Sequence, residues 1–397
     1  MQRSVITLLL VLPIACNGGG TSSGTGTETG SSTDTSTGSG TDTTTGDGPT
    51  TSTTNPPITS TTPTTNEPTS ADPTTGPGPT SMTATTDGPD TTDTAATTDD
   101  TTTGDPVEGV YDPNEDGPWQ YDDIADEIDV DGEMIGVTAY YPTSGPEEGP
   151  YPVVLLAHGF NLPPTQYTNY ATRLASHGYV VVNVDHAGYI FGDVNHVANA
   201  NQVLAGLDWA AEHPQLMAVS DINNVGATGH SLGGKISVLA AMYDARIKAA
   251  ITLDPVDGAN MCPNMQACPD VSGMLPIAIP LGFLGETLDT AGFMACAPAA
   301  ENFTTFYAEA DAPALQVTVN GANHMSFLDD VASCGITCSF CQMPTLENAE
   351  VNDLARAYVV AYYGRYLRGN AGYDTYLTGA EAQQRYVDPG LVTIAEK

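Results

Sequence analysis

Ser231 stands in a pattern that can turn a serine side chain into a nucleophile. Residues 229–233 read Gly-His-Ser-Leu-Gly, a β-rich run precedes them, and apolar residues at helical spacing follow. G-x-S-x-G marks a nucleophile where a strand bends sharply into a helix, and its glycines permit a strained turn and close backbone approach. A glycine-rich turn without chemistry is the alternative. The strand before the serine and the helix after it favour the nucleophile.

His324 is the candidate base for this serine. A serine hydroxyl needs a base to take its proton and a carboxylate to orient that base. On folds that carry G-x-S-x-G, the chain order is serine, acid, histidine. The chain has seven histidines, and His324 alone follows Ser231. We therefore predict that His324 is the base. We interpret His230 as structural, His158 as a residue of the pocket wall, and the other histidines as surface or core residues.

The acid is less well defined, because nine carboxylates lie between the serine and the histidine. The chemistry requires a carboxylate at the carboxyl end of a strand close to the nucleophile. Asp254 follows the expected strand directly after the nucleophile's helix, and Asp289 follows the next strand. Both stay open as candidates on this reasoning, and Asp257 and Glu286 are lesser alternatives.

Two backbone N–H groups are candidates to stabilise an oxyanion. Leu232 begins the helix after the serine, where free N–H groups and the positive end of the helix dipole meet. The buried strand at 153–157 ends in His-Gly-Phe-Asn, and a loop of this kind commonly supplies the second donor. We predict Phe160 as that donor. The alternative is that the loop only makes a turn.

The elements expected around these residues define an α/β protein. Alternation over residues 128–141 predicts an antiparallel hairpin at a sheet edge. Further strands are expected at 153–157, 179–184, 222–228, 247–253, 279–284 and, as the last strand, 315–319. Helices are expected at 167–174, at 195–213 with Asp193 as the cap, after the serine, and at 351–362. Their order predicts a mostly parallel sheet with helices on both faces. Together with the G-x-S-x-G turn, this favours the α/β-hydrolase fold.

The first 106 residues have a different character. Residues 1–16 read as a secretory signal, with Arg3 before an apolar run that is too short to span a bilayer. Cys16 at its end predicts a lipoprotein that is acylated at this residue, and an ordinary signal peptide is the alternative. Residues 17–106 hold no aromatic residue, lysine or arginine, so a disordered tether is expected. Residues 107–397 would form the catalytic domain.

The charge of the chain limits its partners. The formal net charge is −38, with only 10 lysines and arginines. Nucleic acids and anionic membrane surfaces both require a basic footprint, so neither is expected to bind. We expect an exported, envelope-tethered monomer whose membrane contact is limited to a lipid on Cys16.

Six cysteines follow Cys16, and an even number in an exported chain predicts up to three disulfides among fifteen possible pairings. The alternative is a metal site that joins His324 to a cluster of three of them, Cys334, Cys338 and Cys341. Disulfides are favoured, because export is oxidising and His324 is already the candidate base.

Residues 151–330 resemble the chlorophyllases, which are α/β-hydrolases that cleave the phytyl ester of chlorophyll. The matching segments are Gly-His-Ser-x-Gly-Gly-Lys at 229–235, Asp-Pro-Val-Asp-Gly at 254–258, Cys-Ala-Pro at 296–298 with Asn302, Phe306, Tyr307 and Glu309, and His-Met at 324–325 with Leu-Asp-Asp at 328–330. The resemblance implies that Asp254 is the acid. The short spacing from serine to acid is also similar to that of the plasma-type platelet-activating-factor acetylhydrolases. Leu232 departs from the pattern, since chlorophyllases carry arginine there.

These observations predict a serine carboxylic ester hydrolase that needs no cofactor or metal and acts on a small-molecule ester or lipid. A lipid or polyester hydrolase with the same residues is one alternative. A non-catalytic surface adhesion module on a hydrolase scaffold is another, although no position of the expected Ser-His-Asp set is missing.

Overall fold

A computed structural model describes residues 108–188, 194–258, 262, 264–292 and 295–397. The expected signal peptide, Cys16, the tether and Asp193 lie outside these residues. Among the described helices, none combines the length and the hydrophobicity that crossing a membrane requires.

The centre of the structure is a nine-stranded sheet with the strand order β1-β2-β4-β3-β5-β6-β7-β8-β9. Strands β4, β3, β5, β6, β7 and β8 are parallel to one another, whereas β1, β2 and β9 pair antiparallel at the two edges. The strands are β1 (Gln120–Val130), β2 (Glu133–Ser144), β3 (Tyr151–Ala157), β4 (Val180–Asp185), β5 (Ser220–His230), β6 (Ile247–Leu253), β7 (Leu281–Glu286), β8 (Ala314–Val319) and β9 (Val392–Glu396).

The hairpin at the sheet edge is confirmed, and Asp131 and Gly132 form its turn with positive φ angles of 56° and 88°. The expectation that the strand at 315–319 is the last one is wrong, because β9 adds to β8 at the far edge. This short edge strand lies far along the chain from its partner, so its pairing leaves no local pattern.

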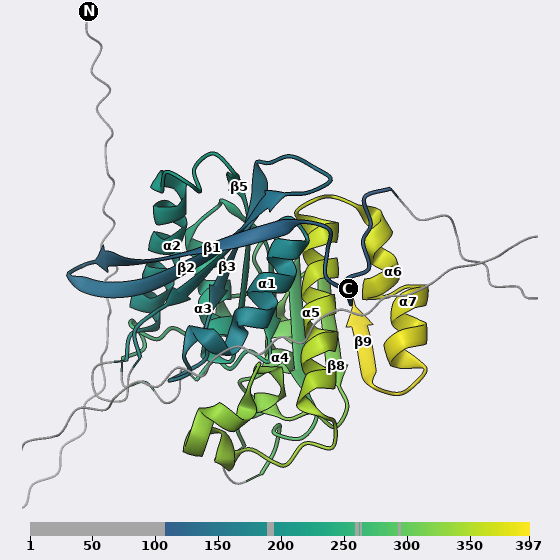
Figure 1. Cartoon of the computed structure of the whole chain (residues 1–397). Helices are drawn as coiled ribbons and strands as arrows, with labels where there is room; N and C mark the ends of the chain where they lie inside the picture. Colours follow the sequence, from purple (N-terminus) through teal and green to yellow (C-terminus); the bar gives the residue numbers. More distant parts are fainter. Residues whose placement is uncertain (1–107, 189–193, 259–261, 263, 293–294) are drawn as a thin grey trace, which may run out of the picture. The chain divides into compact units, whose positions relative to one another are not determined.

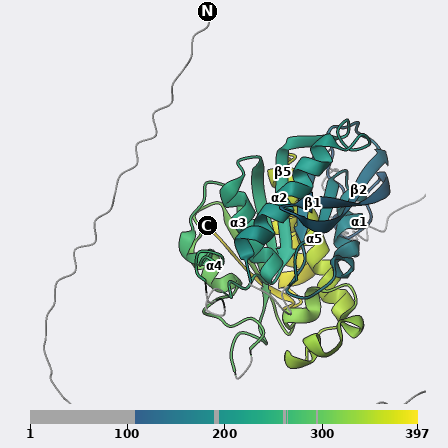
Figure 2. The same cartoon turned by 90° about the vertical axis from the view of Figure 1, so that its left-hand side faces the viewer.

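Helices cover both faces of the sheet. Helices α1 and α5 pack on one face, and α2, α3 and α4 pack on the other, as the cartoon shows (Figure 1). Figure 2 shows α2 and α3 lying side by side. The α-helices are α1 (Thr168–Ser176), α2 (His196–Glu212), α3 (Leu232–Tyr243), α4 (Phe303–Glu309), α5 (Asn348–Tyr366), α6 (Asp374–Leu377) and α7 (Ala380–Ala382). The short helices are η1 (Pro164–Tyr167), η3 (Ser272–Met274), η4 (His324–Phe327), η5 (Val331–Phe340), η6 (Ala371–Tyr373) and η7 (Gln383–Val387).

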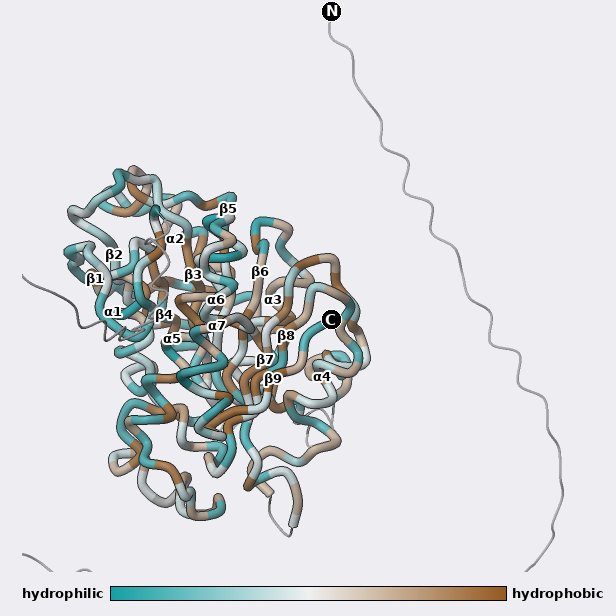
Figure 3. Tube along the Cα trace, turned by 90° about the vertical axis from the view of Figure 1, so that its right-hand side faces the viewer, coloured by the Kyte–Doolittle hydropathy of each residue, from teal (hydrophilic) through white to brown (hydrophobic). Residues whose placement is uncertain are grey.

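The sheet separates two hydrophobic cores. Along β3, Val154 and Leu156 pack with α1 and α5, while Val153, Leu155 and Ala157 pack with α2 and α3. A strand buried on both faces cannot alternate apolar with polar residues, which explains its continuous apolar run. In Figure 3 the brown, hydrophobic part of the tube accordingly follows central strands such as β3.

The helix ends follow local chemistry. Gly178 ends α1 with a positive φ of 82°, as expected for a glycine after a helix. The cap of α2 differs from the expected Asp193, because the side chain of Asn195 accepts a hydrogen bond from Ala198 N at 2.9 Å. Asn195 stands directly before the first helical residue, where a capping side chain reaches the free N–H groups.

Candidate active site

Ser231 sits on a strained turn between β5 and α3. Its φ of 56° and ψ of −122° are unusual for a residue with a side chain. The two flanking glycines are required for space, since a Cβ on Gly229 would overlap the backbone of Gly233, and one on Gly233 would overlap the carbonyl oxygen of Ala157. The geometry therefore lifts one hydroxyl above the carboxyl ends of the parallel strands.

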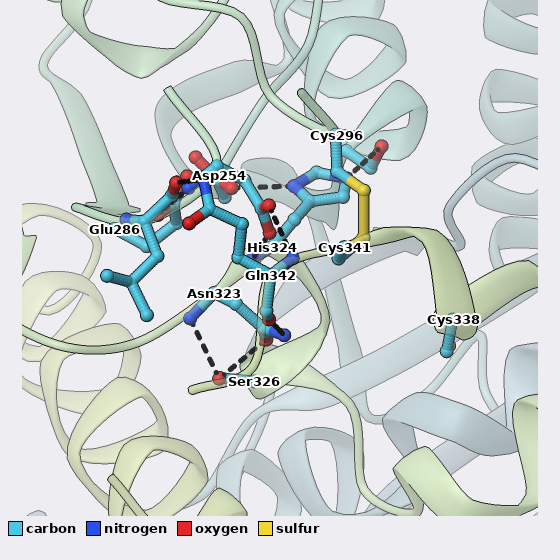
Figure 4. Close-up of a disulfide and its surroundings, with 12 residues drawn as sticks. Asp254, Glu286, Cys296, Asn323, His324, Ser326, Cys338, Cys341 and Gln342 are labelled. Atoms are coloured by element: carbon cyan, nitrogen blue, oxygen red, sulfur yellow. Dashed lines mark hydrogen bonds and ion pairs between the residues drawn. A yellow bond between two sulfur atoms is a disulfide. The ribbon is translucent and has the colours of Figure 1, made fainter. Parts of the chain in front are cut away.

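Three side chains from three strand ends form one hydrogen-bonded series. Ser231 Oγ lies 2.8 Å from His324 Nε2, and His324 Nδ1 lies 2.6 Å from Asp254 Oδ2. Asp254 directly follows β6, and His324 begins the short helix η4 after β8. Asp254 is fully buried and His324 is 3% exposed. Figure 4 shows the contact between the imidazole and this carboxylate.

Asp289, the alternative acid, contacts the same histidine at a different place. Its Oδ2 accepts a hydrogen bond from His324 N at 2.9 Å, and its Oδ1 accepts one from Gln342 N at 2.8 Å. The carboxylate of Asp289 thus holds the main chain of the histidine, while Asp254 holds the ring. The geometry favours Asp254 as the orienting acid.

Comparison with known proteins identifies the family. Residues 135–384, more than half of the chain, match the family described as Chlorophyllase. The chain belongs to the chlorophyllase family. Its α/β-hydrolase fold agrees with the expected fold, and the resemblance inferred from the motifs is confirmed.

The chlorophyllase match extends to individual relatives. The chain is 28% identical over 201 residues to Chlorophyllase-2 of Arabidopsis thaliana, covering 46% of this chain and 63% of that protein. It is 30% identical over 201 residues to Chlorophyllase-1 of the same plant, covering 46% of this chain and 60% of that protein. It is 32% identical over 120 residues to the Bis(hydroxyethyl) terephthalate hydrolase of Streptomyces coelicolor, covering 30% and 37%. The chain thus spans about three fifths of the length of the plant chlorophyllases it matches.

The two expected oxyanion donors come from two different elements. Leu232 is the first residue of α3, and Phe160 follows β3 in the loop beside the serine. Among the described residues, neither N–H has a backbone acceptor. His158, interpreted above as a residue of the pocket wall, is 3% exposed, and its ring stacks on that of His186 at 3.8 Å between centroids.

A buried ion pair joins the two motifs that carry the serine and the acid. Lys235 Nζ donates to Asp257 Oδ1 at 2.9 Å and to the carbonyl oxygen of the same residue at 2.7 Å. Val256 N also donates to the carbonyl oxygen of Ser231 at 3.2 Å. The segment that begins with Asp254 is therefore fixed to the helix that begins after the nucleophile. Both residues belong to motifs that are visible in the sequence, but nothing in the spacing of the two motifs predicts this pair.

Replacing Lys235 by methionine is expected to lower the free energy of unfolding by about 3–5 kcal/mol, because the carboxylate of Asp257 would stay buried without its partner. In the double variant Lys235→Met/Asp257→Asn the charge is gone, while the amide oxygen can still accept from Val271 N and Ser272 N. Urea unfolding should therefore find the double variant more stable than Lys235→Met alone. Equal stability of the two variants would contradict this account of the pair.

Glu286, at the end of β7, is a second buried carboxyl group beside the site. Its Oε2 accepts hydrogen bonds from Leu288 N and Asp289 N, and Oε1 has no partner within the described residues. Burial, reinforced by the neighbouring carboxylate of Asp254, raises the pKa of Glu286 from 4.5 to about 8. The residue is therefore protonated in the folded protein at neutral pH.

This shift predicts a pH dependence of stability. Between the unfolded pKa of 4.5 and the folded pKa of about 8, the native state binds the proton more tightly. The contribution of Glu286 to stability is thus complete below about pH 4.5 and is lost as the pH rises to about 8. Glu286→Gln mimics the protonated form, so its Tm relative to wild type should rise between pH 5 and pH 8. Parallel Tm curves for both proteins would refute the assignment.

The six described cysteines form three disulfides, Cys262–Cys268, Cys296–Cys341 and Cys334–Cys338. Disulfide bonding was the favoured expectation. The alternative metal site with His324 is wrong, because its three cysteines are used in bridges and the ring nitrogens of the histidine contact Asp254 and Ser231. Figure 4 shows the Cys296–Cys341 bridge close to His324 and next to Gln342, whose N–H binds Asp289. The bridge therefore lies beside Asp289, the carboxylate that accepts from both Gln342 N and His324 N.

Proposed function

We propose that this chain is a serine carboxylic ester hydrolase in which Ser231, His324 and Asp254 form the catalytic triad. The observation that carries the proposal is the continuous series from Asp254 through His324 to Ser231, with contacts of 2.6 and 2.8 Å. Membership in the chlorophyllase family and similarity to a protein named as a terephthalate ester hydrolase support the same reaction class.

The reaction follows from the geometry. Ser231 Oγ attacks the carbonyl carbon of the ester while His324 Nε2 takes the hydroxyl proton, and Asp254 stabilises the imidazolium that forms. The N–H groups of Phe160 and Leu232 donate to the oxyanion of the tetrahedral intermediate. The imidazolium then protonates the departing alcohol, which leaves an acyl-serine. Water, activated by the same imidazole, releases the acid and restores the serine.

The substrate proposed is an uncharged, apolar ester. Phe160 is 45% exposed on the loop after β3, and Phe340 and Met343 are 56% and 88% exposed in the segment after His324. Phe160 follows the carboxyl end of β3, and Met343 is next to Gln342, whose N–H donates to Asp289, so exposed apolar groups belong to segments that adjoin the triad. A lipid or a polyester would use the same triad with a different groove.

The test combines a probe with a substrate panel. A serine-directed fluorophosphonate should label the wild-type protein, and p-nitrophenyl esters of increasing acyl length should be hydrolysed. Assays with chlorophyll, a monoacylglycerol and an aliphatic polyester then separate the substrate classes. Failure of both labelling and hydrolysis would favour the non-catalytic adhesion module.

We propose in addition that the protein is exported and tethered to the cell envelope through a lipid on Cys16, as a monomer that does not bind nucleic acid. The signal-like residues 1–16 and the net charge of −38 support this proposal. Mass spectrometry of the mature N-terminus should find an acylated Cys16. A Cys16→Ser variant should be released from membranes.

A further inference from the structure

A buried chain of hydrogen bonds connects the loop of the proposed oxyanion donor with the histidine of the triad. Gly159 N lies 3.1 Å from Tyr167 Oη, which lies 2.9 Å from His230 Nδ1. His230 Nε2 in turn lies 2.8 Å from the carbonyl oxygen of His324. Tyr167 and His230 are both fully buried. The triad itself uses neither side chain.

The direction of every bond in this chain is determined by chemistry. A carbonyl oxygen can only accept, so His230 Nε2 carries a proton and donates it to His324 O. Burial holds the pKa of His230 well below its ordinary value, with the adjacent His324 acting in the same direction. The ring is therefore neutral, and Nδ1 has a lone pair that accepts from Tyr167. The tyrosine oxygen then accepts the N–H of Gly159.

We propose that Tyr167 and His230 are positioning residues that hold the oxyanion loop and the catalytic base in fixed positions relative to the nucleophile. His230 is adjacent to Ser231, so its backbone moves with the nucleophile. Through Tyr167 the same ring holds the N–H next to Phe160, and through Nε2 it holds the main chain of His324. One neutral imidazole thus connects all three parts of the site. This inference rests on the proposed function.

The environment of Gly159 supports a fixed geometry at this point. A Cβ on Gly159 would lie 3.1 Å from both Tyr167 Oη and His230 Nδ1. The loop is thus packed directly against the two side chains that hold it. Because an oxyanion donor acts only where negative charge develops, a displaced loop should weaken the transition state more than the bound substrate.

The test compares two tyrosines whose hydroxyl oxygens each accept a hydrogen bond from one backbone N–H. Tyr167→Phe removes the acceptor of Gly159 N. Tyr373 lies on helix η6, and its Oη accepts from Tyr111 N at 3.2 Å, so Tyr373→Phe removes the acceptor of that N–H. Tyr167→Phe should lower kcat by about 10- to 100-fold with KM changed less than about 2-fold, and should weaken a boronic acid transition-state analogue in parallel. Tyr373→Phe should lower Tm similarly while kcat stays within about 2-fold of wild type.

A second variant protects the test against a folding defect. His230→Gln can still donate to His324 O, but it has no acceptor atom in the place of Nδ1, so Tyr167 loses its partner. The kcat of this variant should therefore fall to about the level of Tyr167→Phe. Because both changes break one connection, the double variant should lose little more than either single one. A Tyr167→Phe variant or a His230→Gln variant with kcat within about 2-fold of the Tyr373→Phe control would overturn the proposal.

A readout that needs no turnover separates this inference from the proposed function. Amide exchange at Gly159 and Phe160, followed by NMR, should be faster in Tyr167→Phe and unchanged in Tyr373→Phe. Unchanged exchange in Tyr167→Phe would overturn the positioning role even in an active enzyme. Absence of hydrolysis and of fluorophosphonate labelling in wild type would instead count against the hydrolase itself.

Discussion

Replacing Ser231 by alanine is expected to lower kcat by about 10⁴- to 10⁶-fold, because the acyl-enzyme can no longer form and only the oxyanion donors and substrate binding remain. The loss should be in kcat, with KM changed far less, since the hydroxyl acts in the chemical step. Labelling by a fluorophosphonate should disappear as well. Hydrolysis of a p-nitrophenyl ester and gel fluorescence after labelling measure the two effects.

A second serine, on the helix that follows the nucleophile, provides the control. Ser237 is buried, and its hydroxyl donates to the carbonyl oxygen of Gly233 at 2.8 Å. Ser237→Ala should keep both turnover and labelling, apart from a modest loss of stability. Equal labelling of wild type and Ser231→Ala would exclude Ser231 as the nucleophile.

Replacing Asp254 by asparagine is expected to lower kcat by about 10⁴-fold, because an amide in this place favours the wrong tautomer of the imidazole and cannot stabilise its charge. Asp289→Asn should cost far less, about 10- to 100-fold. That amide can still accept from one of the two N–H groups that the carboxylate now binds, and the ring of His324 keeps its partner Asp254.

The two variants are matched controls for each other, since each replaces one buried carboxylate that contacts the same histidine. Steady-state kinetics on one ester, with Tm measured alongside, separates a catalytic effect from a loss of folding. A collapse of turnover in Asp289→Asn alone would show that the acid is assigned to the wrong strand.

Much of the fold could be predicted from local patterns. Continuous apolar runs predict the strands that are buried on both faces, and the expected strand at 247–253 coincides with β6. Histidine order alone selected His324, because only one histidine follows the serine. Chain order could not choose between Asp254 and Asp289, since both follow neighbouring parallel strands and both reach His324. The choice of Asp254 required the resemblance to the family. In the structure, Asp254 contacts the ring of His324, whereas Asp289 contacts its main-chain N–H.

The rest of the site depends on contacts between distant residues. The spacing of Tyr167 predicts a place in an amphipathic helix, and nothing in it shows that the hydroxyl meets His230, 63 residues further along. Glu286 resembles a solvated loop carboxylate in the sequence, but β7 extends to this residue and buries it. Lys235 and Asp257 could have been found as a pair only by asking why two separate motifs each carry a charge in an apolar setting.

The placement of Asp254 and Asp289 has an evolutionary consequence. Carboxylates from two adjacent strand ends already converge on His324, one at the ring and one at the peptide group. A descendant of this chain could therefore transfer the orienting role from one strand to its neighbour by rearranging the surroundings of the histidine. No new acidic residue would have to appear, and the intermediate forms could retain a carboxylate beside the base throughout.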